Sequence, residues 1–175
     1  MRTLILFLLF LPLGLNADEP AIEFNNHDGA FEVSSTVHSY HPTAFDGEVV
    51  VRGELVLQVV RDPFSNTLEG YRIRLIPEDL EVFPYVVEGF YAKPLTTVSL
   101  LNSDDILQMV FTPDELASIA ESDELFVSRR GYFTVRDYGT SVECDSRQYY
   151  GELAAFSPDT MELAYHSDRE EMHGC

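Results

Sequence analysis

Five arginines and one tyrosine occupy the polar positions of segments that alternate apolar and polar side chains. The segments 48–61, 71–75 and 125–137 show this alternation, which is typical of strands with one buried face. Guanidinium groups form paired hydrogen bonds with carboxylate and phosphate oxygens, and a tyrosine ring offers a surface for stacking. The polar faces therefore predict a binding surface for an anionic or sugar-like ligand, made of Arg52, Arg72, Arg74, Arg130, Tyr132 and Arg136.

The same arginines are equally suited to pairing with carboxylates across neighbouring strands. Glu54, Glu69 and Asp137 lie in or beside the same segments. Exposed pairs of this kind each stabilise a sheet by under about 1 kcal/mol. A cationic ligand surface and a set of surface ion pairs are both open at this point, and the choice depends on which strands are neighbours.

A second function follows from the net charge. The chain has 30 Asp and Glu against 11 Lys and Arg, a formal charge of −19. Such a surface repels nucleic acid phosphates and anionic lipids, so we expect no nucleic-acid partner and no membrane partner after signal cleavage. It attracts cationic groups. The alternative function is therefore an acidic inhibitor or sequestering partner of a cationic protein.

Motifs of the common enzyme classes do not occur in this sequence. There is no Gly-x-Ser-x-Gly elbow, no His-Glu-x-x-His pair, no phosphate-binding loop and no Gly-x-Gly-x-x-Gly turn. His38 and His41 would point to opposite faces of a strand, and the His and carboxylate cluster at 166–173 lies in a polar tail. We predict a non-enzymatic binding or accessory protein with no catalytic residues, no cofactor and no metal site.

The first residues have the parts of a secretory signal peptide. Arg2 precedes an apolar run at 4–15 that contains Pro12 and Gly14, and Ala17 stands at the boundary with an acidic stretch. The run is shorter than the roughly 20 residues that a membrane-spanning helix needs. We expect residues 1–17 to be removed and the remaining chain to be exported, either to a periplasm or outside the cell.

Two cysteines, Cys144 and Cys175, remain after this removal. An even pair in an exported protein predicts a disulfide. It would close a loop of about 30 residues, stabilise the fold by roughly 3 to 4 kcal/mol, and tie the acidic tail to the body. A reactive nucleophile at Cys144 is the alternative, although no motif for one surrounds it.

The chain shows no internal repeat and no long linker, so we expect one domain. An N-terminal extension at 18–47 precedes a body at 48–156, and an acidic tail follows at 157–175. Gly53 and Gly131 interrupt two long apolar strand patterns, and a mid-strand glycine indicates a bulge or a sharp bend. We expect these two stretches to be curved neighbours in a closed sheet.

One segment has a clear helix start. Thr112 and Glu115 form a capping box, with Pro113 at the first helical position. A helix of two to three turns is too short to be stable alone, so it should dock on the sheet. The segment 106–111 is interpreted as part of a hairpin or bulged strand with 97–101, and 158–165 as a possible further helix.

The order of these elements is the order of an OB-fold: a long bent strand, a hairpin partner, a third strand, a helix and two more strands. From residue 48 to 156 the chain resembles small exported bacterial OB-fold-like proteins, through Val51-Arg52-Gly53-Glu54-Leu55 and Arg130-Gly131-Tyr132-Phe133-Thr134-Val135. The resemblance implies a mainly β fold, namely an OB-like five-stranded barrel with one short capped helix, whose outer sheet face and loops carry ligands. The segment 76–96 is longer than this pattern requires, so the strand order between 76 and 101 stays open. A β-sandwich with one helix is the alternative.

Overall fold

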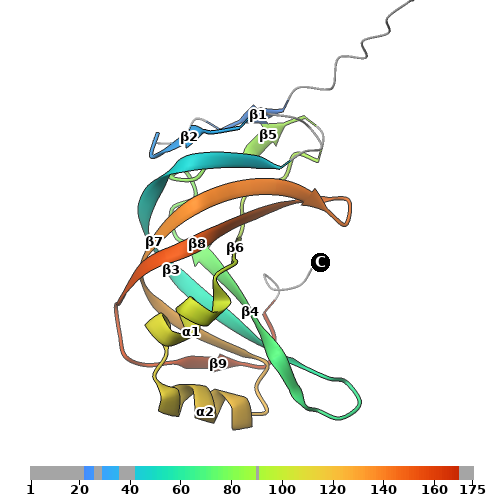
Figure 1. Ribbon diagram of the computed structural model, residues 1–175, viewed down its shortest axis with the longest axis vertical. Coiled ribbons are helices and arrows are strands. Elements are labelled where there is room, and N and C mark those ends of the chain that lie inside the picture. Colours follow the sequence, from blue (N-terminus) through green and yellow to red (C-terminus); the bar gives the residue numbers. More distant parts are fainter. Residues whose placement is uncertain (1–21, 26–28, 36–41, 90, 170–175) are drawn as a thin grey trace, which may run out of the picture.

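The computed structural model describes residues 22–25, 29–35, 42–89 and 91–169 (Figure 1). The predicted signal peptide, Cys175 and the pair His38 and His41 lie outside these ranges. The signal peptide and the pairing of Cys144 with Cys175 therefore stay predictions.

The described chain is mainly β, as the sequence predicts. Its elements are β1 (Glu23–Phe24), β2 (Phe31–Val33), β3 (Thr43–Arg61), β4 (Leu68–Pro77), β5 (Val86–Glu88), β6 (Val98–Leu100), α1 (Ser103–Val110), α2 (Pro113–Glu121), β7 (Phe126–Glu143), β8 (Ser146–Pro158) and β9 (Ala164–His166).

Five of the strands form a closed ring. The order β3-β4-β6-β8-β7 returns to β3, because β3 pairs with β4 on one side and with β7 on the other. Neighbours are antiparallel except β6 and β8, which are parallel. The short strands β2 and β9 extend the sheet from β3 and β7, and β1 pairs separately with β5. The long strands β3 and β7 curve around the molecule (Figure 1).

Gly53 and Gly131 face each other in the β3–β7 ladder. A Cβ added at Gly53 would lie 2.5 Å from the carbonyl oxygen of Ile76 on β4, and one at Gly131 would lie 2.4 Å from that of Ser157 on β8. Both positions need glycine because the backbone of a third strand crosses directly against them. The prediction that these stretches are neighbours in a closed sheet is confirmed.

Apolar side chains at alternate strand positions fill the ring. The expected inward set on β3 is buried, from Val49 to Val59, and Phe133 and Val135 of β7 are buried against it. The helices α1 and α2 lie at one end of the ring, and β1, β2 and β5 at the other (Figure 1). The core therefore continues from the helix side chains Ile106 and Ile119 through the ring.

The connection between β4 and β6 closes the end opposite the helices. Phe83, Val86 and Leu95 of this connection are buried. The hydroxyl of Tyr138 donates to the carbonyl of Pro84 at 2.7 Å, and that of Tyr149 donates to the carbonyl of Lys93 at 2.5 Å. The segment whose strand order was left open is thus held over the core by two buried tyrosines, and within it the structure forms β5.

Two local predictions are wrong. The segment 106–111, expected as strand, belongs largely to α1, where Ile106 and Val110 form the buried face one turn apart and Asp104 and Asp105 stand in the first turn. The described chain thus has two helices where one was expected. The tail segment 158–165, expected as a possible helix, ends β8 and begins β9, which pairs with β7.

The capping box at Thr112 is confirmed. The backbone N–H of Glu115 donates to Thr112 Oγ1 at 3.3 Å, and Glu115 Oε2 accepts from the backbone N–H of Thr112 at 2.7 Å. The other oxygen of Glu115 is paired with Arg129, whose guanidinium also donates to the carbonyls of Val110 and Met161. Arg129 is 3% exposed, so this buried group joins both helices, β7 and the C-terminal segment.

Stability should fall in acid partly through Glu115. Burial raises the pKa of this carboxyl, but hydrogen bonds from the Thr112 backbone and from Arg129 outweigh it and bring the pKa below 4.5. The resulting stabilisation is present above about pH 4.5 and is lost as the pH falls through the folded-state value. We expect the stability gap between the wild type and Glu115→Gln to narrow from pH 6 to pH 3 in urea titrations. A gap that stays constant across this range would contradict the assignment.

Candidate binding site

The six residues predicted as a ligand surface lie on the outside of the ring. Arg52 is opposite Tyr132 in the β3–β7 ladder, and Arg130 is opposite Glu54. The remaining residues are Arg72 and Arg74 on β4, across β3 from β7, and Arg136 farther along β7.

Two of these arginines are engaged in ion pairs with surface carboxylates. Arg52 contacts Glu78 at 2.9 Å and Asp159 at 2.8 Å, and the hydrogen bond with Asp159 is the main reason that its pKa is raised. Arg136 contacts Asp137 at 3.2 Å and Glu152 at 3.5 Å. These guanidinium groups would have to leave their partners to bind an external anion.

The C-terminal segment covers part of the same face. Arg169 pairs with Glu54 at 2.9 Å, and His166 Nε2 lies 3.2 Å from Ser128 Oγ. Burial raises the pKa of Glu54, but its hydrogen bond from Arg169 and its other partners outweigh that effect and lower the pKa overall. An Arg/Tyr ligand surface stays a prediction, and these contacts favour the alternative of surface ion pairing.

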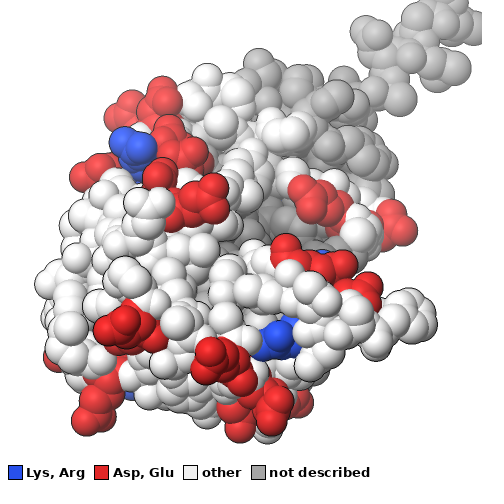
Figure 2. Space-filling view, turned by 60° about the horizontal axis from the view of Figure 1, so that its bottom comes forward, with Lys and Arg blue, Asp and Glu red and all other residues white. Residues whose placement is uncertain are grey.

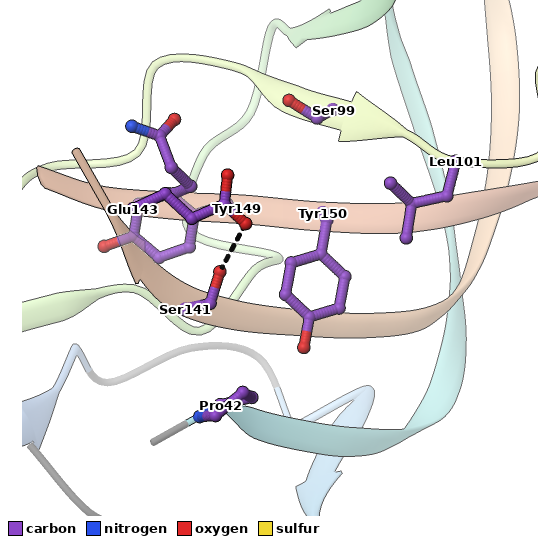
Figure 3. A pocket seen from close by; sticks show the side chains of 8 residues that line it. Pro42, Ser99, Leu101, Ser141, Glu143, Tyr149 and Tyr150 are labelled. Carbon is purple, nitrogen blue, oxygen red and sulfur yellow. Dashed lines mark hydrogen bonds between the residues drawn. The ribbon is translucent and has the colours of Figure 1, made fainter. Parts of the chain in front are cut away.

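A different hollow, of about 340 Å³, opens on the outside of β6, β7 and β8 (Figure 3). This size is within the range of small-ligand sites. Side chains from three strands line it, together with the residue after β6 and the residue before β3. They are Pro42, Ser99, Leu101, Ser141, Glu143, Gln148, Tyr149 and Tyr150, and we call this cavity the Tyr150 hollow.

Tyr150 is fixed in the hollow by a glycine on the neighbouring strand. It pairs with Gly139 in the β7–β8 ladder, and a Cβ added at Gly139 would lie 2.6 Å from atoms of the Tyr150 ring. The ring therefore rests on the β7 backbone. Figure 3 shows it extending from β8 across β7 toward Pro42.

Among the described residues that line the Tyr150 hollow, Glu143 is the one charged side chain. Ser141 Oγ donates to its Oε1 at 3.3 Å, which is the dashed line in Figure 3. Burial raises the pKa of Tyr150, and the negative charge of Glu143 raises it further. The described lining contains no basic residue. It combines an aromatic surface, a carboxylate and neutral polar groups, an arrangement suited to recognising a cation.

No feature of the sequence other than strand alternation indicates this hollow. Ser99, Gly139 and Tyr150 come together only because β8 lies between β6 and β7, and that order is not readable from spacing. Within the ranges that the structure describes, no group of three or more His, Cys, Asp or Glu side chains is placed to hold a metal ion.

Comparisons with protein-family models, with curated proteins and with solved structures find no match to this chain. In the described part of the chain, neither helix has the length and apolar character needed to cross a bilayer.

Proposed function

We propose that this chain is an exported, non-enzymatic binding protein whose partner is a cationic polypeptide. The observation that carries the proposal is the placement of charge. Arg52 and Arg136 lie on the outer face but are paired with the protein's own carboxylates, while many other acidic side chains face solvent. The net charge of −19 is therefore presented to the surroundings with little cationic surface to offset it.

The excess of acidic over basic side chains is clearest at the helix end of the ring. Neither α1 nor α2 has a basic residue in its last turn, and between residues 75 and 128 Lys93 is the only basic residue. Figure 2 brings this end forward and shows acidic side chains spread over it with few basic ones. The exposed acidic residues of the helices and of the loop that follows them are Asp104, Asp105, Asp114, Glu121 and Asp123.

The strand arrangement supports an OB-like barrel as the scaffold. Three features agree with that fold. The ring order is β3-β4-β6-β8-β7, the pair β6–β8 is parallel, and the helices lie between β6 and β7 in the chain, the third and fourth ring strands in sequence order. OB-folds bind ligands on the face of their second and third strands and in the loops next to it. Ser99 on the third ring strand, and Glu143 beside the last turn, line the Tyr150 hollow. This analogy favours a binding role.

The test is calorimetric titration of the chain lacking residues 1–17 with a cationic model protein. Acetylation of that protein's lysines gives a matched control with its positive charge removed. We expect affinity to fall at least tenfold between about 0.01 M and 0.15 M salt, because the screening length shrinks from about 30 Å to about 8 Å. Absence of binding at low salt, or equal binding of the acetylated control, would refute the proposal.

A further inference from the structure

We propose that the Tyr150 hollow binds one basic side chain, preferably arginine, of the cationic partner. The inference rests on the proposed function for the source of that side chain. At the Tyr150 hollow, the general attraction between the acidic surface and the cationic partner would become a specific contact.

The first step is the aromatic surface. A guanidinium or ammonium group gains energy by lying against the face of a tyrosine ring. Such a contact is stronger when the ring is held in place before binding, because less freedom is lost. Tyr150 meets this condition, since its ring lies against the backbone at Gly139 and its neighbours in the hollow are Leu101 and Pro42.

The second step is the carboxylate. Glu143 lines the same hollow as Tyr150, and after burial its negative charge is the second cause that raises the pKa of the Tyr150 hydroxyl. Ser141 donates to one carboxylate oxygen, which holds the side chain in position and leaves further acceptor capacity for a ligand. A cation seated on Tyr150 would therefore meet a nearby negative charge.

The third step is selectivity. A phosphate or carboxylate ligand would be repelled by Glu143 and would find no basic side chain among the lining residues that the structure describes. A neutral sugar could bond to Ser99 and Gln148 but would gain nothing from the charge. Arginine has five N–H donors and a planar group that stacks on aromatic rings, whereas lysine is a strongly hydrated point charge. The expected order of affinity is arginine, then lysine, then neutral ligands.

The direct experiment is an NMR titration of ¹⁵N-labelled protein with Nα-acetyl-arginine methylamide. The citrulline analogue is the control, because it has nearly the same shape without the charge. We expect shifts concentrated in β6, the second half of β7 and β8, with an affinity at least fivefold above that for citrulline. Equal shifts with citrulline, or shifts located elsewhere, would overturn the proposal, and this comparison needs no variant.

Variants then separate the two features of the hollow. Glu143→Gln removes the charge and Tyr150→Leu removes the ring, and each should weaken arginine binding at least fivefold. The matched controls are Glu32→Gln and Tyr132→Leu, which alter an exposed carboxylate on β2 and an exposed tyrosine on the Arg/Tyr face. Circular dichroism establishes that each variant is folded. Unchanged arginine binding by both hollow variants would count against the site.

The same variants distinguish this inference from the proposed function. If the cationic model protein binds the wild type, Glu143→Gln and Tyr150→Leu with equal, salt-dependent affinity, the hollow is not the anchor while the proposed function stands. If that protein fails to bind but the arginine derivative still titrates the hollow, the proposed function fails and the cation site stands.

Discussion

Gly131→Ala should lower the free energy of unfolding by about 3 kcal/mol, the upper end of the usual cost of overpacking. The added methyl group would lie 2.4 Å from the carbonyl oxygen of Ser157 and 3.0 Å from the Cα of Pro158. Both are backbone atoms of β8, so a rotamer change cannot relieve the contact. Relief requires β8 to move away from β7 along part of their ladder. Urea denaturation followed by circular dichroism measures the effect.

Gly139→Ala is the matched control, since it makes the same substitution in the same strand. Here the atoms in the way belong to the Tyr150 side chain, which the added methyl group would push off its resting position on the β7 backbone without moving a strand. Alanine also restricts the unfolded chain more than glycine does. We expect a stability change under about 1 kcal/mol, together with displacement of the Tyr150 ring and weaker arginine binding. A cost at Gly131 no larger than that at Gly139 would show that the β8 backbone does not cross where the structure places it.

The ring itself was predictable because its signals are local. Alternating apolar residues from Val49 to Val59 define an inward face, and a glycine at the centre of such a pattern indicates close backbone approach. The capping box at Thr112 identifies the start of its helix from neighbouring residues alone, without information on tertiary contacts. Together these signals define two curved strands and a docked helix, which is most of the scaffold.

What failed or stayed open depends on contacts between distant segments. The residues of α1 are too few for their periodicity to separate helix from strand, and burial of Ile106 and Val110 at the end of the ring decides the outcome. The connection between β4 and β6 takes its shape from hydrogen bonds to Tyr138 and Tyr149, which lie more than 50 residues away. The spacing of residues in the sequence does not indicate the burial of α1 or the hydrogen bonds of the two tyrosines.

The candidate site shows the same division between local and distant information. Alternation placed Arg52 and Arg136 correctly on the outer face, but it could not show which carboxylates would pair with them. Asp159 reaches Arg52 from 107 positions along the chain. In the Tyr150 hollow, Tyr150 and Gly139 come together only because β8 lies between β6 and β7, and the spacing of residues in the sequence does not indicate that order.

Arg129→Met should cost about 3 kcal/mol, because truncating one member of a buried ion pair leaves its partners unsatisfied. Arg129 points inward between Val127 and Gly131, where strand alternation would place an apolar residue. Its loss leaves the carboxylate of Glu115 without its ion-pair partner and removes donors from the carbonyls of Val110 and Met161. Thermal and urea unfolding measure the change.

Arg130→Met is the matched control, since Arg130 is the next residue and is exposed. Surface substitutions of this kind usually change stability by no more than about 0.5 kcal/mol. The double variant Arg129→Met/Glu115→Gln should recover part of the loss, because it also removes the carboxylate charge that Arg129→Met alone leaves without an ion-pair partner. Equal stability of the two single variants would mean that Arg129 does not join the helices to β7. A double variant whose losses simply add would show that Glu115 and Arg129 act independently, in which case the acid sensitivity expected for Glu115 would have to come from its capping bonds alone.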